Sequence, residues 1–239
     1  MASWGQPAVG GERYTGLFPS RSAILGLMAA ALGISRDNGN DLDEISQSVS
    51  VASKVISHGQ LLRDYHTTQA PKTERKRNFS TRKQELELGT LSTVLSSRDY
   101  RCDAIWIVAL YLKEGAHYSL EQFRQALLKP VYPLYLGRKS CPLAIPVMPK
   151  IVQTDNLRQA LDTKFPSITV SEASDRYFFH GYGHDRVETY FWEGNSQDFG
   201  DHQDEILAYQ IWDEPIDRQR WQFTQRWQYQ VSIAVEERK

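Results

Sequence analysis

Cysteine is scarce in this chain, which has 239 residues but only two cysteines, Cys102 and Cys141. Two cysteines cannot build a disulfide framework, and no zinc-binding spacing is visible around them. No secretory signal pattern opens the printed sequence, so we expect a reducing, cytoplasmic compartment. The length leaves room for one large domain or two small ones.

Excess positive charge is also absent, because 28 Lys and Arg residues balance 29 Asp and Glu residues, giving a net charge of −1. A uniformly basic nucleic-acid-binding protein is therefore excluded. The charges are nevertheless uneven: residues 185–217 hold ten acidic residues and one basic residue. This distribution predicts one surface for a polyanion and another that avoids it. The opposite bias occurs in residues 72–83, where Glu74 is accompanied by Lys72, Arg75, Lys76, Arg77, Arg82 and Lys83.

Motifs for cofactors and metals are missing as well. Gly10 and Gly11 are not followed by the Lys-Ser/Thr pair of a Walker loop, and no GxGxxG pattern occurs. There is no HExxH motif, and His180, His184 and His202 are scattered along the acidic part of the chain. The sequence therefore predicts no cofactor and no metal site.

An uncharged apolar stretch covers residues 22–34, but its thirteen residues are too few to cross a bilayer. Leu, Ile, Met and Ala recur on every side of it, which is typical of a helix buried in a protein core. Pro19 and Ser20 form a stop-and-cap signal at its start, and Gly33 suits the position after its last turn.

Arg21 lies in the first turn of this predicted helix, where the helix dipole disfavours a cation. One interpretation is an anion site, in which a phosphate binds the free N–H groups of the turn together with Ser20, Arg21 and Ser22. The alternative is an ordinary ion pair between Arg21 and a nearby carboxylate. The basic segment and the family resemblance described below favour the anion site.

Apolar periodicity predicts several strands. Residues 49–56 alternate as a strand, Gly59 helps to break it, and residues 60–68 can return as its hairpin partner. The near-continuous apolar run at residues 102–112 predicts a central strand. Further aromatic-rich strands are expected at residues 176–182, 187–192, 206–212 and 227–234.

Helices are expected to alternate with some of these strands. A polar turn at residues 36–44 leads to a short helical segment. Ser119 caps a helix at residues 120–129, and a third short helix is expected at residues 156–164. The order helix, two strands, excursion, strand, helix is that of a ferredoxin-like fold whose first strand is absent, so the predicted class is α+β.

The basic segment lies within an excursion, residues 71–89, that has little apolar periodicity. Six cations around Phe79 suit a nucleic-acid backbone, although charge runs are more often simply solvated. Because the run lies in the middle of the domain and not at a terminus, binding is favoured. Residues 90–97 return either as a strand or as a short helix.

The loop LYLGRKSCP, residues 134–142, is a second candidate for RNA binding. Gly137 permits a positive-φ backbone, and Arg138, Lys139 and Ser140 supply consecutive donors. Tyr135 offers a ring on which a base can stack. A surface turn with two solvated cations is the alternative.

The segment LRDYHTT, residues 62–68, is a third candidate. In a strand, Arg63 and Tyr65 lie on one face while Asp64 and His66 lie on the other. Tyr65 and His66 carry groups capable of acid–base chemistry on RNA 2′-hydroxyls, but no clear catalytic partner accompanies them.

Five motifs, in order, resemble the CasD family, the backbone-cap subunits of type I-E CRISPR Cascade complexes. They are SWGQP at residues 3–7, TGLFPSRSAILGLMAAALGI at 15–34, LLRDYHTTQ at 61–69, YRCDA at 100–104 and LLKPVYPLYLGRKSCPLAIP at 127–146. Beyond residue 146 the resemblance is loose, apart from DEPI at residues 213–216 and the final strand.

The resemblance implies a ferredoxin-like (RRM-like) palm at residues 1–146, a basic thumb inserted at about 70–97, and a smaller strand-rich region at 147–239. It implies CRISPR RNA, the backbone subunits and the large subunit as partners, with target DNA reached through the complex and no membrane. It implies a non-catalytic subunit that binds the RNA 5′ handle. A metal-independent ribonuclease using Tyr65 and His66, as in type I-C relatives, is the runner-up.

Site residues carried over from the resemblance combine with those named above. Thumb contacts are expected from the six cations of residues 72–83. RNA contacts are expected from Ser20, Arg21, Ser22, Arg63, His66, Tyr135, Gly137, Arg138, Lys139 and Ser140.

CasD-like chains have a β-strand before the segment that matches residues 3–7, and the printed numbering starts at that segment. Since a first strand is central in a ferredoxin-like sheet, we expect that the gene starts upstream. A strand from the C-terminal region or from a partner subunit is the alternative.

Overall fold

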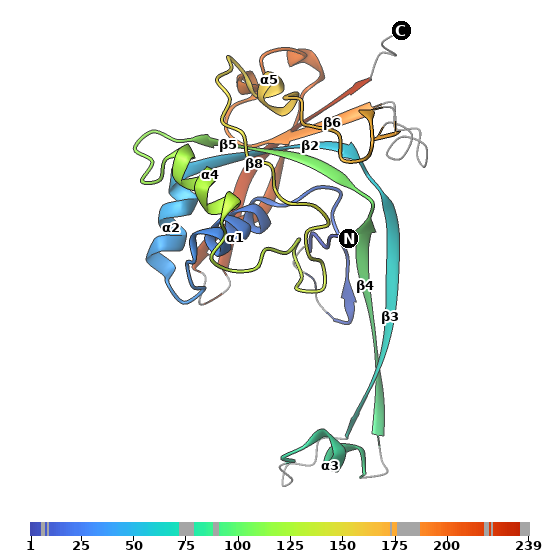
Figure 1. The fold of residues 1–239 in the computed structure, drawn as a ribbon. Helices are drawn as coiled ribbons and strands as arrows, with labels where there is room; N and C mark the ends of the chain where they lie inside the picture. The colour runs from blue at the N-terminus through green and yellow to red at the C-terminus, as the bar shows by residue number, and fades with distance from the viewer. Residues whose placement is uncertain are drawn as a thin grey trace.

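The chain forms two β-sheets with few helices, a mixed α+β arrangement (Figure 1). The computed structural model describes residues 1–5, 8, 10–71, 79–87, 91–172, 174–175, 187–217, 220 and 222–234. The helices are α1 (Arg21–Leu32), α2 (Gly39–Ser48), α3 (Arg82–Leu86), α4 (Leu120–Leu128) and α5 (Leu157–Leu161), with 3₁₀ turns at Ser196–Phe199 and Gln203–Glu205. The strands are β1 (Glu12–Arg13), β2 (Val49–Ser57), β3 (Gln60–Pro71), β4 (Leu91–Cys102), β5 (Ile105–Leu112), β6 (Val187–Trp192), β7 (Leu207–Asp217) and β8 (Gln222–Ala234).

Helix α1 is the buried helix that the sequence predicts. The Ser20 side chain accepts a hydrogen bond from the N–H of Ala23, and Gly33 ends the helix in the left-handed region at φ 79°. These caps satisfy backbone groups that the helix leaves open. Apolar residues of α1 pack with α2, α4 and one face of β2, in a core formed by Ile24, Leu25, Met28, Ala29, Ile45, Val49, Val51 and Phe123.

The five-stranded sheet has the order β5-β2-β6-β8-β7. Strand β2 is buried along most of its length and pairs with both β5 and β6. The expectation of one central strand over residues 102–112 is wrong, because Asp103, at φ 56°, separates β4 from β5. Strand β5 lies at the end of the sheet as described, and apolar packing on both of its faces explains its apolar sequence.

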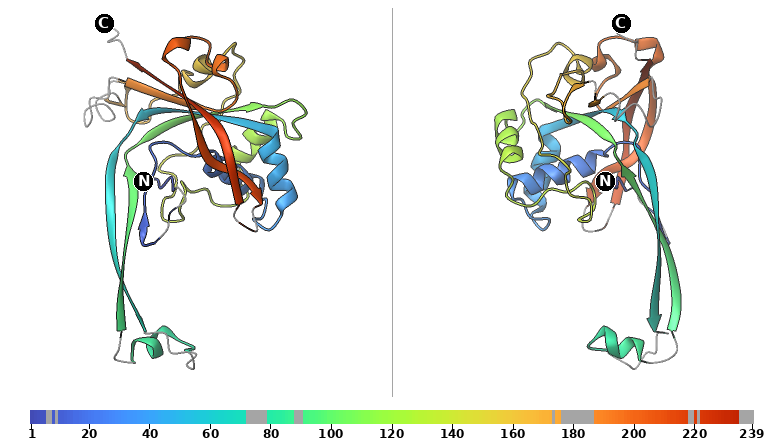
Figure 2. Two further views of the ribbon diagram at one scale, coloured as in Figure 1. Left: turned by 180° about the vertical axis from the view of Figure 1, so that it is seen from behind. Right: turned by 45° about the vertical axis from the view of Figure 1, so that its right-hand side comes forward.

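Strands β3 and β4 form a long antiparallel arm. Their register runs from Gln60 opposite Cys102 to Pro71 opposite Leu91. In all views of Figures 1 and 2 this arm extends away from the body, with α3 beyond the ends of its strands. The predicted pairing of residues 60–68 with residues 49–56 is wrong, since β3 pairs with β4. Residues 91–97 belong to strand β4, while residue 90 lies outside the described residues. The arm is longer than the predicted thumb at residues 70–97.

Gly59 makes possible the change of chain direction between the end of β2 and the start of β3. Its φ is +59°, and a Cβ at this position would lie 2.0 Å from the carbonyl oxygen of Cys102. Only glycine tolerates both this conformation and this close backbone contact without rearrangement. The chain therefore leaves the five-stranded sheet at Gly59 and enters the arm.

The C-terminal strands complete the sheet. Strands β6, β7 and β8 confirm three of the four strands expected after residue 168, while residues 176–182 lie outside the described residues. Trp192, Tyr190 and Phe199 pack with α5 on the sheet face opposite α1 (Figure 1). The expected division at residue 146 stays a prediction, and the sheet takes strands from both sides of it.

A buried lysine ties α5 to this sheet. Lys54 Nζ lies 2.7 Å from carboxylate oxygens of both Asp162 and Glu188. Tyr190 donates its hydroxyl to Asp162 at 2.8 Å, and burial raises the pKa of this tyrosine. A buried ammonium is tolerated here because two carboxylates surround it.

Arg21 is the main buried ionic contact between the helical layer and the C-terminal strands. Its Nε lies 2.8 Å from Glu193, its NH1 lies 3.2 Å from Glu214, and its NH2 donates to the carbonyl oxygen of Ser46 at 2.7 Å. Glu193 also accepts from the backbone N–H of Val51 at 2.6 Å. The arginine side chain is only 3% exposed. The expected anion site at Arg21 is therefore corrected, since its donors are used by carboxylates and by α2.

None of the described helices is long and apolar enough to cross a membrane.

Replacing Arg21 with Met is expected to lower the free energy of unfolding by about 3–5 kcal/mol, because Glu193 would stay buried with only the more distant Arg226, 3.7 Å away, as its cation. Urea unfolding followed by tryptophan fluorescence measures this change. The matched control is Arg124→Met, which breaks an exposed pair with Glu121 on α4 and should cost about 1 kcal/mol or less. Equal losses in the two variants would contradict the role given to Arg21.

Candidate nucleic-acid interface

The segment around Gly137 is a closed turn. Tyr135 and Pro142 form an antiparallel bridge, and Leu136 donates its N–H to the carbonyl oxygen of Cys141 at 2.8 Å. Gly137 has φ +85°, the conformation that the sequence predicts for it. Cys141 is fully buried and anchors the turn, whereas Lys139 and Ser140 are exposed. The turn thus exposes the Lys139 ammonium and the Ser140 hydroxyl on a backbone that the buried Cys141 holds in place.

This turn rests against the N-terminal segment at the root of the arm. Ser3 donates its N–H to the carbonyl oxygen of Leu136 at 3.0 Å, and a Cβ at Gly137 would lie 1.9 Å from the carbonyl oxygen of Ser3. The adjacent Ala2 exchanges two backbone hydrogen bonds, each 2.8 Å, with Arg101 of β4. Gly137 is therefore needed for close backbone packing as well as for the turn itself.

A cluster of arginines surrounds Asp99 at this junction, and we call it the arm-root cluster: Arg63, Asp99, Arg101 and Arg138. Arg63 makes a bidentate pair with Asp99, with distances of 2.8 and 3.0 Å. The hydrogen bond from Arg63 is the largest cause of the lowered pKa of Asp99, and the charges of Arg101 and Arg138 lower it further. Three guanidinium groups and one carboxylate leave the cluster with excess positive charge.

The arm-root cluster is lined with aromatic rings. The Arg138 guanidinium carbon lies 5.1 Å from the centre of the buried Tyr100 ring, and that of Arg63 lies 5.8 Å from Tyr14. Both distances are in the range of cation–π contacts. The rings help to hold the two guanidinium groups in place.

Three buried donors at the arm root have no hydrogen-bond acceptor within the described part of the chain. They are Nε1 of Trp4, Nε of Arg101 and NH1 of Arg138. Most buried polar groups in proteins are paired, so unpaired buried donors are uncommon.

Tyr65 and His66 lie on opposite faces of β3, as the strand alternation predicts. The His66 ring contacts the Asp64 carboxylate, whereas the Tyr65 side chain is 64% exposed on the side of Arg63. The two side chains therefore do not point at a common atom. The structure as described offers no geometric support for Tyr65 and His66 as a catalytic pair.

The start of α1 does not face a cluster of free donors. Ser20 caps the helix and its hydroxyl lies 3.1 Å from that of Ser22, while Arg21 is buried among carboxylates. RNA contacts of Ser20 and Ser22 stay predictions.

The predicted thumb cations are described only in part. Lys72, Arg75, Lys76 and Arg77 lie outside the described residues. Arg82 pairs with Glu85 at 2.6 Å and contacts the carbonyl oxygen of Gln69. Lys83 is 85% exposed and lies 3.8 Å from Glu87. Lys83 is the more accessible of the two described cations.

The sequence predictions missed Trp4, Asp99, Tyr100 and Arg101 as site residues. Each lies inside a segment quoted for the family resemblance or directly beside one. The alternation of RDYR at residues 98–101 would have put Asp99 and Arg101 on one face of a strand. Their proximity to Arg138 depends on the docking of the turn, which no local pattern shows.

No group of three or more His, Cys, Asp or Glu side chains that could hold a metal ion occurs among the described residues.

Comparisons with known proteins agree with one another. A model of the CRISPR-associated Cas5 proteins matches residues 1–229. Among curated proteins, the chain is 37% identical over 169 residues to the CRISPR system Cascade subunit CasD of Escherichia coli (strain K12), covering 67% of this chain and 71% of that protein.

Two solved structures of CRISPR-associated proteins have a similar fold. A chain of a CRISPR RNA-guided surveillance complex matches with a TM-score of 0.62 and 25% identity, over 98% of this chain and 86% of that one. A structure described as a Cas protein matches with a TM-score of 0.59 and 22% identity, over 98% of this chain and 90% of the other, and shows likeness of fold alone.

Replacing Asp99 with Asn tests the arm-root cluster. The folded-state pKa of Asp99 lies below its unfolded value of about 3.9, so its ionised form stabilises the fold above that pH. We expect Asp99→Asn to lower the free energy of unfolding at pH 7 by about 1–3 kcal/mol. The difference in free energy of unfolding between this variant and the parent chain, which we call the gap, should disappear as the pH falls below about 4.

Urea unfolding at pH 7 and at a series of lower pH values measures this gap. The control is Asp155→Asn at an exposed carboxylate, which should leave stability almost unchanged at every pH. A gap for Asp99→Asn that stays constant down to pH 2 would contradict the assignment.

Proposed function

Because the chain belongs to the Cas5 family of CRISPR-associated proteins, we propose that it binds the 5′ handle of CRISPR RNA and caps the backbone of a Cascade complex. It is a CasD-like Cascade subunit of type I-E, and other Cascade subunits are its partners. The arm-root cluster is the observation that carries the RNA-binding part of this proposal. It concentrates positive charge in a chain whose net charge is −1.

The exposed part of the proposed RNA surface is the 135–142 turn. Lys139 offers a cation for a phosphate, and the Tyr135 ring, 40% exposed, can stack on a base. Arg63 is 54% exposed although it pairs with Asp99, so part of its guanidinium stays accessible. Arg21 has no part in this surface, since its donors are buried.

The fold supports a palm-and-thumb arrangement. In this proposal the five-stranded sheet with α1 and α4 is a ferredoxin-like palm, and the β3–β4 arm is the thumb. Strand β1 pairs with β4 only at Ser97 and Arg98, so the outer part of the arm is a two-stranded ribbon. Such a ribbon is marginally stable by itself, and its exposed side chains favour a contact with RNA or a neighbouring subunit. Tyr65, Leu95 and Val94 are each more than half exposed along it.

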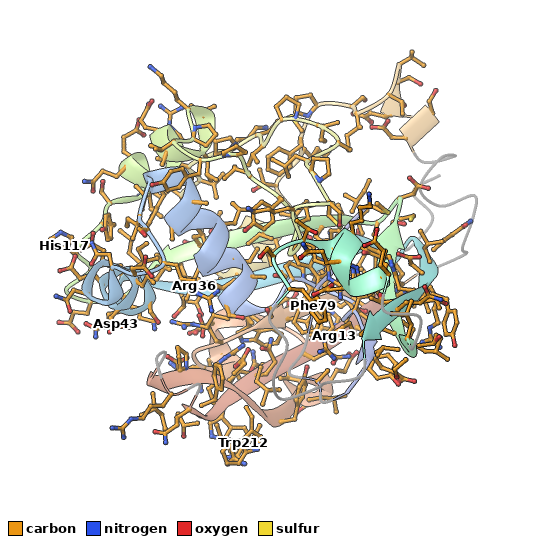
Figure 3. The ribbon with its side chains drawn as sticks, turned by 90° about the horizontal axis from the view of Figure 1, so that it is seen from below. Arg13, Arg36, Asp43, Phe79, His117 and Trp212 are labelled. Atoms are coloured by element: carbon orange, nitrogen blue, oxygen red, sulfur yellow. The ribbon has the colours of Figure 1, made fainter. Side chains whose placement is uncertain are left out.

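A second exposed surface suits assembly with another protein. Trp212 and Trp227 are 62% and 52% exposed, and the β7–β8 register puts both on one face. Figure 3 shows Trp212 pointing outward from this part of the sheet. Exposed aromatic patches of this kind are typical of protein interfaces. Acidic residues dominate this part of the chain and would repel the phosphates of RNA. We therefore assign this surface to a neighbouring Cascade subunit and not to RNA.

The double variant Tyr135→Ala, Lys139→Ala tests RNA binding by the turn. In complexes assembled with the other Cascade subunits, we expect the affinity for CRISPR RNA to fall about tenfold or more, since one stacking contact and one phosphate contact are lost. RNA recovered with the complex at increasing salt measures the loss.

The matched control is Tyr132→Ala, Lys129→Ala, a similarly exposed pair just before the turn. Normal RNA recovery is expected for this control. If the turn variant and the control both retain RNA at all salt concentrations, the turn does not bind the handle.

The runner-up function, ribonuclease, has its own test. Because Tyr65 and His66 point to opposite faces of β3, we expect the purified chain to leave repeat RNA intact. Gel analysis with detection of 2′,3′-cyclic phosphate ends checks this. A cyclic phosphate product that disappears in His66→Ala would establish the ribonuclease in place of the non-catalytic role.

A further inference from the structure

Helix α1 is buried on the side of the core, but its opposite side is open. The buried positions of the helix are Arg21, Ile24, Leu25, Met28, Ala29 and Ala31. Ser22 and Gly26, four positions apart, are exposed, and Ala30, a further four positions along, is only partly buried. Residues spaced by four lie on the same side of a helix. We call Ser22, Gly26 and Ala30 the open side of α1.

The open side carries no charge. No charged residue occurs between Arg21 and Arg36. The Ser22 hydroxyl lies 3.1 Å from the Ser20 hydroxyl, so the polar group on this side already has a partner within the chain. A helix that is apolar all round is typically covered all round. Helix α1 thus has the sequence of a fully covered helix, whereas this chain covers only part of it.

Gly26 gives a second, independent sign that another surface meets this side. It lies in the middle of α1 and does not have the positive φ that would require glycine. A Cβ at this position would meet no atom of the described residues within 4 Å. Glycine in the middle of a helix is less favourable than alanine, so its presence here destabilises the free chain. A close approach from outside explains the glycine, since the missing side chain lets a partner backbone lie against the helix.

Exposed aliphatic side chains border the open side at the C-terminal end of α1. Val131 donates its N–H to the carbonyl oxygen of Ala31 at 3.0 Å, and its side chain is 63% exposed. Leu128, at the end of α4, is 53% exposed. Figure 1 shows α1 and α4 on the side of the sheet toward which the arm extends. The uncharged surface therefore continues from α1 onto the segment that follows α4.

The chemistry of this surface favours a protein over RNA. The open side offers no cation to a phosphate, and a phosphate that lost its water here would not be compensated. An apolar protein segment, in contrast, gains free energy by burying Val131 and Leu128. Interface cores of proteins are likewise poor in charge.

We infer that the open side of α1 is a docking surface for an uncharged, apolar segment of a neighbouring Cascade subunit, whose backbone lies against Gly26. This inference rests on the proposed function for its partner, since the chain is there one subunit of a complex. The surface is distinct from the one that carries Trp227. Two residues from Trp227, Tyr229 stacks on Trp192 on the sheet face opposite α1.

The variant Gly26→Leu tests this surface in the full chain, reconstituted with the other Cascade subunits and CRISPR RNA. Leucine fits the open space of the free chain, but in the complex it would occupy the place of the partner backbone. Recovery of the chain with the other subunits after a high-salt wash should fall about tenfold or more, as expected for overpacking at a close contact. High salt weakens RNA phosphate contacts, so the wash reports on the protein contact.

The matched control is Gly39→Leu at the start of α2. Gly39 is also an exposed helical glycine at which a Cβ would meet no described atom within 4 Å. This control should be recovered like the parent chain. Urea unfolding of the free chains checks that the variants fold, and the midpoint of Gly26→Leu should lie at or above that of the parent. Gly26→Ala is the second variant, which should also unfold at higher urea and lower the recovery by a smaller factor.

Binding of a single-stranded RNA octamer to each free chain, measured by fluorescence anisotropy, separates this inference from the proposed function. Lost subunit recovery with parent-like RNA affinity in Gly26→Leu supports the docking surface. Parent-like recovery of both Gly26 variants overturns it while RNA binding stands. If the parent chain does not bind the octamer but Gly26→Leu alone loses recovery, the docking surface stands and the RNA-binding function is contradicted.

Two other occupants of the open side would each overturn the inference. Loss of RNA affinity in Gly26→Leu but not in Gly39→Leu would make the open side an RNA surface. A dimer of the free parent chain in sedimentation that Gly26→Leu abolishes would assign the open side to a second copy.

Discussion

The buried ion pair between Arg21 and Glu193 is the interaction on which the rest of this structure depends. Arg21 begins the main core helix, while Glu193 follows β6 and also accepts the backbone N–H of Val51 in β2. One side-chain pair therefore joins the helical layer to the middle of the five-stranded sheet. Arg226 of β8 lies 3.7 Å from the same carboxylate, which extends the network to a third strand. Buried charges need such complete pairing because an unpaired one is costly.

The arm root differs from this buried network in its balance of charge. The arginine that begins α1 is neutralised inside the fold, whereas Arg101 and Arg138 near the surface are not matched by an equal number of carboxylates. Two glycines create that region. Gly59 directs the chain into the arm, and Gly137 lets the turn approach Ser3. Positive charge at the arm root is thus a result of backbone geometry as much as of composition.

Several elements could be predicted from sequence because their causes are local. The apolar stretch of α1, its serine cap and its C-terminal glycine all lie within a few residues of one another, and the capping box of Ser119 with Gln122 is equally local. The failures involve partners. Residues 60–68 have the alternation of a strand, but alternation does not say whether β2 or β4 will be the neighbour. Likewise, the apolar run of β5 indicates that both faces of the strand are covered by other residues. It does not indicate where the strand lies in the sheet.

The sequence by itself determined the family, the α+β class, the buried helix and the exposed glycine turn, because ordered motifs and short-range periodicity carry that information. Only the tertiary structure decided that Arg21 pairs with Glu193, 172 residues away, and that Arg138 lies beside Tyr100. The physical reason is that an arginine in a first helical turn has the same local preferences whether its partner is a phosphate or a carboxylate. Which partner the arginine pairs with depends on the long-range packing that brings β6 to α1. The sequence pattern does not indicate that packing.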